Sequence, residues 1–302
     1  MRPVSFTYLA PDSAEEALAQ LASYAGNARL LAGGQSLIPL LNLRISRPAA
    51  LVDLGRCSEL AYLRREGDWL ASGPMTRQVM AEHAALVREN CPLLGKALRH
   101  LGPPAVRNRA TIGGTLAHAD RVAELPGVAL ALGAEFIAQG PGGRRVIPAE
   151  KFFRGDLTNA LDPDEMLREI RFPTAPPSSG SAFVEACNRH HDLMLVGIAA
   201  QLEFGVDGSC SAARIAAAGV QSTPVRLRQT EARLVRAGQL DEAAILEAAR
   251  LSLEDVEPEG DLHASAAYRR RVMVGLVERA LRQAAGDATG GSRRGGGGHG
   301  HG

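Results

Sequence analysis

The pattern of hydrophobic and polar positions predicts a chain that opens with a small β-α-β arrangement. Ser13 and Glu16 form a capping box, the usual start of a helix. The apolar residues that follow at helical spacing are Ala14, Ala17, Leu18 and Leu21. Short apolar runs at 29–32 and 51–54 then predict two strands, so we expect a short sheet with helices packed against it.

From Trp69 the pattern predicts a second group of elements. Thr76 is expected to cap a helix that runs to about Arg88, and Pro92 stands at a first helical position. Glycines at 140–143 predict a hairpin. The expected strands are 69–71, 135–138, 145–147 and 166–172.

Residues 173–180, rich in proline and serine, read as a linker to a separate α+β unit. Arg269–Arg271 lie on a helix and are expected to form a solvated face, and the glycine-rich tail from Gly286, which contains His299 and His301, is expected to be disordered. The predicted strands of this unit are 181–186, 195–204 and 212–220, and its predicted helices are 223–235, 241–252 and 264–283. The predicted domains are 1–174, with lobes of about 1–56 and 57–174, then 181–285, then the tail 286–302.

Composition and charge exclude several kinds of protein. The chain has 302 residues, 45% hydrophobic and 22% charged, with a formal net charge of +1. A balance so close to zero gives no reason to expect nucleic acid or an anionic membrane as a partner. Apolar runs fall short of the roughly 18–20 residues that span a bilayer, and residues 1–8 lack the apolar core of a signal peptide. We therefore expect a cytoplasmic protein.

The cysteines are scattered, without a C-x-x-C pair. They are Cys57, Cys91, Cys187 and Cys210. This spacing gives no disulfide framework, zinc site or iron–sulfur ligand set, so we expect reduced and mostly buried thiols.

The common catalytic motifs are missing from the sequence. There is no G-x-G-x-x-G fingerprint, phosphate loop, G-x-S-x-G elbow or H-E-x-x-H helix. His190-His191-Asp192 could serve in acid–base chemistry, although three adjacent polar residues beside a linker are also typical of a solvated stretch.

Two Gly-Gly segments, each after a β-like stretch, are the strongest candidates for chemistry. The first is Ala32-Gly33-Gly34-Gln35-Ser36-Leu37, and the second contains Thr111-Ile112-Gly113-Gly114-Thr115. Paired glycines let successive N–H groups converge on an anion, and neighbouring hydroxyls add donors. Two such nests suit a ligand with two linked phosphates. The alternative is that both segments are ordinary turns.

At these segments the sequence closely resembles the FAD-binding medium subunit of the molybdenum hydroxylases, the family of bacterial carbon monoxide dehydrogenase, whose flavin domain is related to that of xanthine dehydrogenase. Residues 32–48, AGGQSL followed by IPLLNLRISRP, resemble the first flavin loop, and residues 106–120, VRNRATIGGTLAHAD, resemble the second. The similarity extends to about Ala284 through further matching positions, which are 52–54, 151–153, 223–226 and 267–269.

The resemblance implies an α+β fold. Residues 1–174 would form a two-lobed FAD-binding domain of the p-cresol methylhydroxylase and vanillyl-alcohol oxidase type, and a small C-terminal domain with a short antiparallel sheet and helices would follow. Residues 32–37 and 111–115 would hold the pyrophosphate through their N–H groups, and Asp120 and Glu124 would accept hydrogen bonds from ribityl hydroxyls. Asp192 would lie near the flavin ring. As alternatives, Asp120 could cap a helix that begins near Val122, and Glu124 could simply lie in its first turn.

The sequence departs from the family pattern at a few positions. Ala110 stands where glycine is usual, Arg121 where proline is usual, Glu124 where aspartate is usual, and Leu193 where an aromatic residue is common. Gln35 offers no nucleophile where related oxidases carry a flavin-linking histidine, so non-covalent FAD is expected.

By resemblance, the chain would be an oxidoreductase subunit without a catalytic acid or base. Its partners would be a large subunit that binds the molybdenum cofactor and a small subunit with [2Fe–2S] clusters, assembled as a dimer of heterotrimers. It would pass electrons from those clusters through FAD to an external acceptor. The alternatives are a stand-alone FAD-dependent reductase or oxidase of the same fold and a non-catalytic scaffold subunit.

Overall fold

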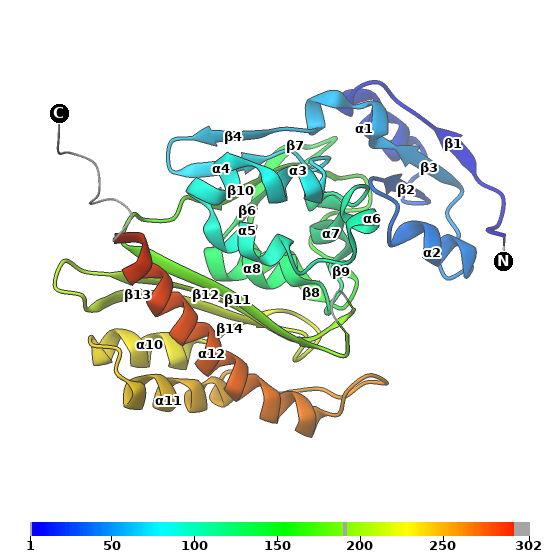
Figure 1. Ribbon diagram of the computed structural model, residues 1–302. Helices are drawn as coiled ribbons and strands as arrows, with labels where there is room; N and C mark the ends of the chain where they lie inside the picture. Colours follow the sequence, from blue (N-terminus) through cyan, green and yellow to red (C-terminus); the bar gives the residue numbers. More distant parts are fainter. Residues whose placement is uncertain (1, 190–191, 293–302) are drawn as a thin grey trace, which may run out of the picture. The chain divides into compact units, whose positions relative to one another are not determined.

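The chain folds into two compact units. The computed structural model describes residues 2–189 and 192–292. The first unit comprises Met1–Cys91, Leu101–Asp120 and Gly133–Pro173, and the second comprises Pro92–His100, Arg121–Leu132 and the chain from Thr174 onward (Figure 1). Both units mix helices with sheets, which confirms the predicted α+β class.

The first lobe of the first unit is a three-stranded parallel sheet. Strands β1 (Thr7–Leu9), β2 (Ala28–Leu31) and β3 (Ala50–Asp53) lie in the order β1-β3-β2. Helix α1 (Ala14–Ser23) buries the four residues predicted from its spacing. Ser13 accepts the N–H of Glu16 as expected, whereas the Glu16 carboxylate bonds the N–H of Asp12 rather than that of Ser13. Helix α2 (Leu37–Asn42) begins at the last residue of the first Gly-Gly segment.

The second lobe is a five-stranded antiparallel sheet in the order β4-β5-β10-β6-β7. The hairpin predicted at Gly140–Gly143 is present. The strands are β4 (Leu63–Glu66), β5 (Trp69–Ser72), β6 (Glu135–Gly140), β7 (Gly143–Pro148) and β10 (Met166–Pro173). The short elements around it are η1 (Leu54–Arg56), η2 (Ser58–Leu60), α6 (Pro104–Arg107), α7 (Ile112–His118), α9 (Ala149–Phe152), β8 (Phe153–Gly155) and β9 (Thr158–Asn159).

One helix prediction in this lobe is wrong. Thr76 does not cap a helix, because its hydroxyl donates to the carbonyl of Tyr62 at 2.7 Å. Helix α3 (Gln78–His83) begins after Arg77, which gives no side-chain cap. The chain then turns extended at Ala84 (φ −70°, ψ 128°), so a separate helix, α4 (Ala85–Asn90), follows. A tertiary hydrogen bond outweighed the local capping preference of threonine.

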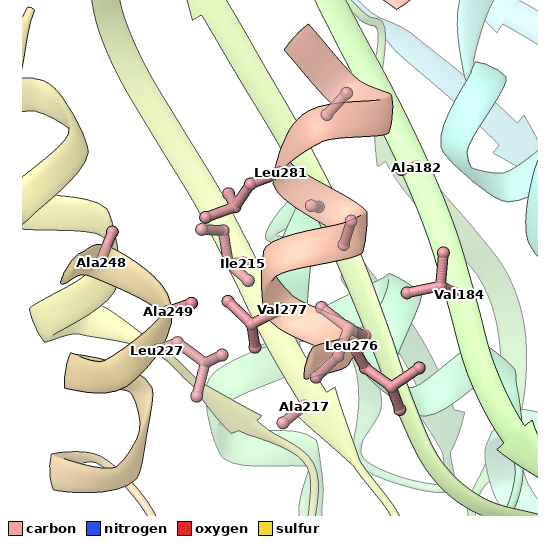
Figure 2. Close-up of a cluster of buried hydrophobic side chains, with 14 of the residues drawn as sticks. Ala182, Val184, Ile215, Ala217, Leu227, Ala248, Ala249, Leu276, Val277 and Leu281 are labelled. Carbon is pink, nitrogen blue, oxygen red and sulfur yellow. The ribbon is translucent and has the colours of Figure 1, made fainter. Parts of the chain in front are cut away.

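The second unit is a four-stranded antiparallel sheet, covered on one face by its C-terminal helices. Strands β11 (Ser179–Cys187), β12 (Met194–Phe204), β13 (Cys210–Ala218) and β14 (Val225–Arg226) lie in chain order. The helices are α10 (Arg228–Ala237), α11 (Glu242–Leu251), η3 (Ser252–Glu254) and α12 (Ala266–Ser292). Figure 2 shows part of their shared core, in which Ile215 of β13 lies toward Leu281 and Val277 of α12 and Val184 of β11 points toward the same helix.

Two helices from the middle of the chain also belong to this unit. Helices α5 (Pro92–Leu98) and α8 (Glu124–Leu132) pack against strands β11–β13. All nine residues of α8 are buried, which is typical of a helix enclosed on every side. The sequence placed both segments inside the predicted region 1–174, although they pack with elements that follow residue 174.

The structure moves two boundaries near the C-terminus. Pro224 does not start a helix, because Val225 and Arg226 pair with β13 as β14 and α10 begins only at Arg228. Residues 286–292 are helical rather than disordered, since α12 extends to Ser292. Asp287 anchors this part of the helix by accepting the N–H of Ser181 at 3.0 Å and pairing with Lys96 at 2.6 Å. His299 and His301 lie outside the described residues.

The prediction that Arg269–Arg271 form a solvated face is wrong for Arg269. Arg269 is fully buried, whereas Arg270 and Arg271 are exposed. Its guanidinium donates to the carbonyls of Leu195 and Gly219, and to the Asp261 carboxylate at 2.5 Å. Arg269 therefore joins two strand ends and the loop before α12.

Asp261 is expected to make the second unit sensitive to acid. Burial opposes its ionisation, but hydrogen bonds from the N–H groups of Ala264 and His263 and from Arg269 outweigh that effect and lower its pKa from 3.8 to about 2. As the pH falls, Asp261 is therefore protonated in the unfolded chain at a higher pH than in the folded protein. Its stabilising contribution is complete above about pH 4 and disappears as the pH falls toward 2.

The measurement is the free energy of unfolding from urea titrations between about pH 5 and pH 3. The free-energy difference between wild type and Asp261→Asn should shrink as the pH falls through this window. A difference that stays constant with pH would show that Asp261 has no depressed pKa.

Candidate functional site

A large cavity lies between the two lobes of the first unit. Its volume is about 870 Å³, within the range of sites for cofactors and drug-sized ligands. Four stretches line it: the end of β2 with residues 32–37, residues 110–118, the β8–β9 hairpin, and residues 161–167 at the start of β10. We call it the interlobe cavity.

The first Gly-Gly segment lines this cavity over its whole length, from Ala32 to Leu37. A Cβ atom on Gly33 would lie 2.3 Å from the carbonyl oxygen of Arg109, so only glycine allows the two segments to approach so closely. That carbonyl is held in place by a hydrogen bond from the Arg77 side chain. Gly34 follows with φ +74°, a conformation that glycine adopts without strain.

This segment, which lines the cavity, contains a run of amides without a hydrogen-bond partner among the described residues. In the described part of the chain, no hydrogen-bond acceptor faces the N–H groups from Gly33 to Leu37. The Gln35 side chain donates instead to the carbonyl of Gly33 at 3.1 Å. Buried or half-buried N–H groups normally have a partner, so consecutive amides without one indicate a site for an anion.

The second segment is built differently from the prediction. Gly113 and Gly114 lie in the first turn of α7, not in a loop, and Thr111 caps this helix by accepting the N–H of Gly114 at 2.9 Å. The N–H groups of Ile112 and Gly113 donate to the carbonyls of Thr76 and Pro74. These amides are therefore occupied, and the segment offers the cavity its hydroxyls rather than a second amide nest.

The predicted site residues divide into three groups. Ala32–Leu37, Thr111 and Gly113–Thr115 line the interlobe cavity, whereas Ile112 is fully buried in α7 and does not. Asp120 also does not line it, and its Oδ2 lies 3.9 Å from Nε2 of His118, which does. Glu124 and Asp192 belong to the second unit, where Glu124 is the first residue of α8 and Asp192 is exposed and bonded to the N–H of Leu193.

Sequence reasoning missed a third side of the cavity. Leu157, Asn159 and Glu165 line it, yet no motif pointed to them, and His118, which lies inside the motif at 106–120, was not singled out. Leu157 has φ +53° at the tip of the β8–β9 hairpin and is half exposed, an uncommon conformation for a branched apolar residue that is found near functional sites. Arg145 bonds Glu165 and holds the pKa of this carboxyl below its usual value.

Comparison with known proteins agrees with this architecture. A family model described as the FAD binding domain in molybdopterin dehydrogenase matches residues 4–175, and one described as the CO dehydrogenase flavoprotein C-terminal domain matches residues 181–284. The two-lobed unit with its interlobe cavity is thus of the FAD-binding class.

Similar proteins define the family in more detail. The 6-hydroxypseudooxynicotine dehydrogenase complex subunit alpha of Paenarthrobacter nicotinovorans is 40% identical over 94% of this chain and 96% of its own length. The carbon monoxide dehydrogenase medium chain of Hydrogenophaga pseudoflava is 35% identical over 94% and 98%. The solved quinoline 2-oxidoreductase of Pseudomonas putida 86 aligns with a TM-score of 0.90 at 36% identity, over 95% of this chain and 99% of the other.

The chain belongs to the family of FAD-binding medium subunits of the molybdenum hydroxylases. The predicted family, the FAD cofactor and the place among oxidoreductase subunits are confirmed. The assignment of individual residues to FAD stays a prediction.

No helix within residues 2–189 and 192–292 is both long and apolar enough to cross a membrane.

Proposed function

We propose that this chain holds FAD non-covalently in the interlobe cavity and connects [2Fe–2S] clusters of a small partner subunit with an external electron acceptor. A large partner subunit would carry the molybdenum cofactor, in a dimer of heterotrimers. The main support is the run of amides from Gly33 to Leu37, unpartnered within the described residues, in a segment that lines a cavity of about 870 Å³. A cytoplasmic location remains a prediction.

The residues of the cavity fit an FAD pyrophosphate. The amides from Gly33 to Leu37 would donate to its oxygens, and the hydroxyls of Thr111 and Thr115 would approach from the opposite lobe. Hydrogen bonds to an ionised phosphate are about twice as strong as neutral ones. Gln35 has no nucleophilic atom, and its amide is engaged with Gly33, which supports non-covalent attachment.

Bound FAD supplies the capacity to accept and release an electron pair, and the protein supplies position and electrostatics. No acid–base residue of this chain is required. The proposed role of Asp120 is indirect, because it lies beside His118 at the cavity rather than in its wall. The roles proposed for Glu124 and Asp192 rest on the resemblance to the family alone.

The properties of the four cysteines support the proposal that the [2Fe–2S] clusters reside in a partner subunit. Cys57 and Cys91 belong to the first unit, and Cys187 and Cys210 to the second. Burial raises the pKa of Cys57 and of Cys210 to about 11, so both favour the protonated thiol over the thiolate that binds iron.

We also propose domain boundaries of 1–174 for FAD binding and 181–285 for the C-terminal domain. Helices α5 and α8 pack against β11–β13, so a fragment that ends at residue 174 would expose apolar surface of both.

The deciding experiment is purification of the tagged chain from its own cells, with mass identification of the proteins that accompany it. We expect equimolar large and small subunits, and flavin absorbance that bleaches when the substrate of the large subunit is added. The chain alone should retain FAD but should not be reduced by that substrate.

Other outcomes identify the rivals. Turnover of an organic substrate by the isolated chain would indicate a stand-alone reductase or oxidase. A folded, colourless chain that binds no FAD would indicate a scaffold subunit.

A further inference from the structure

A second cavity lies on the five-stranded sheet of the first unit and shares no lining residue with the interlobe cavity. Its volume is about 350 Å³, near the lower end of the range for small-molecule sites. Its charged lining residues are Arg64, Arg144, Arg168 and Arg171, with Glu59 and Glu169. We call it the arginine cavity.

A β-bulge turns Arg168 toward this cavity. Leu167 pairs with Ala138 and Glu169 with Ile137, so Arg168 is the extra residue of β10. A bulge interrupts the alternation of a strand and re-aims the side chain that it contains. The adjacent residues Arg168 and Glu169 therefore both line the cavity.

Arg168 is half-buried, and one of its guanidinium nitrogens lacks a hydrogen-bond partner among the described residues. Its side chain is 17% exposed, and its Nη1 is buried with no hydrogen-bond partner in the described part of the chain. Two carboxylates lie near Arg168 but beyond hydrogen-bond distance. Oε1 of Glu15 is 3.6 Å from Nη2, and Oε1 of Glu59 is 4.0 Å from Nη1 and already accepts the N–H of Ala14 at 2.7 Å. A buried guanidinium nitrogen without a hydrogen-bond partner indicates that an acceptor is missing from the cavity.

Glu169, the other acidic lining residue, is already satisfied. Its carboxylate accepts hydrogen bonds from Tyr62 at 2.6 Å, Arg64 at 2.8 Å and Arg171 at 2.6 Å. Burial opposes its ionisation, but these bonds keep its pKa below the usual value, so it stays charged and fixes the arginines around it. The lining itself has an excess of two positive charges, and the carboxylates of Glu66 and Glu15, which approach Arg64 and Arg168, lie outside it.

We propose that the arginine cavity binds a small oxyanion, either inorganic phosphate or the phosphate group of a phosphorylated small molecule. Guanidinium groups match phosphate in shape and donor number. An excess of two positive charges suits a phosphate, which carries about −1.5 to −2 near pH 7, better than a single carboxylate. The proposal does not depend on the electron-transfer role.

The test is isothermal titration of the full chain saturated with FAD, which keeps probes out of the interlobe cavity. The probes are inorganic phosphate and AMP. We expect one saturable site per chain, and Arg168→Gln should weaken binding at least about tenfold, because it removes charge-assisted hydrogen bonds. Equal affinity for both probes would mean that only the phosphate group is recognised, and tighter AMP binding would indicate a phosphorylated small molecule.

Two further variants keep the test decisive. Arg144 is exposed and lines the same cavity, so Arg144→Gln should weaken binding without threatening the fold. Arg65 neighbours Arg64 on β4 but does not line the cavity, so Arg65→Gln changes the net charge equally and should leave binding unchanged. The proposal is overturned if neither phosphate nor AMP gives a saturable heat of binding. It is also overturned if Arg65→Gln weakens the affinity as much as the two cavity variants do.

Discussion

Gly34→Asp is expected to abolish FAD retention, whereas Gly34→Asn should keep most of it. Gly34 has φ +74°, and asparagine and aspartate are the residues that best tolerate this conformation after glycine. Both side chains meet the same neighbour, because a Cβ at this position lies 3.1 Å from Cγ1 of Ile38. The two variants therefore share strain and crowding and differ mainly in charge.

The added carboxylate would face the amides that we propose hold the pyrophosphate. Two like charges about 4 Å apart at an effective dielectric constant of about 20 repel by roughly 4 kcal/mol, or about a thousandfold in Kd. The readout is the ratio of flavin to protein after gel filtration, with circular dichroism to verify folding. Stoichiometric FAD in a folded Gly34→Asp protein would show that the first Gly-Gly segment does not hold the pyrophosphate.

Arg269→Met should cause the largest loss of stability among single substitutions on α12. The change removes a fully buried guanidinium and leaves Asp261 and two carbonyls without their donor. Leaving a buried carbonyl without its donor costs about 1–3 kcal/mol, and two are affected here, whereas the exposed Asp261 contributes less. We expect the thermal midpoint of the second unit to fall by roughly 10 °C.

Exposed Arg270 gives the matched control, since Arg270→Met should change stability by no more than about 0.5 kcal/mol. The double variant Arg269→Met with Asp261→Asn should recover part of the loss, because it no longer leaves an unpaired carboxylate. Differential scanning calorimetry of all the variants measures both effects. Equal midpoints for Arg269→Met and Arg270→Met would mean that the buried arginine contributes nothing to stability.

The second Gly-Gly segment contributes to the flavin site in a different way from the first. With the amides of Ile112 and Gly113 engaged by Thr76 and Pro74, the two lobes do not contribute equivalent nests. The first lobe contributes amides and the second contributes hydroxyls on α7. Within the described residues the first segment has a run of free amides, whereas in the second the amides of residues 112–115 are engaged.

The sequence by itself determined most of the longer strands and helices, because these follow from local periodicity and capping, whereas short elements such as α2, α7 and β14 were not predicted. Helix α1 was predicted from four apolar positions and Ser13, and the 140–143 hairpin from its glycines. The two glycine pairs and their flanking residues also sufficed for the family. Such signals lie within a few residues of one another, so no knowledge of the fold is needed to interpret them.

Tertiary structure decided whatever depends on residues far apart in the chain. Arg269 and Arg270 are indistinguishable by local pattern, yet Arg269 is buried because Leu195, Gly219 and Asp261 converge on it. The burial of α8 against β12 and β13, and the bulge that turns Arg168 toward its cavity, depend likewise on pairings between distant segments. Periodicity reports which face of an element is apolar, but only the folded chain determines what that face meets.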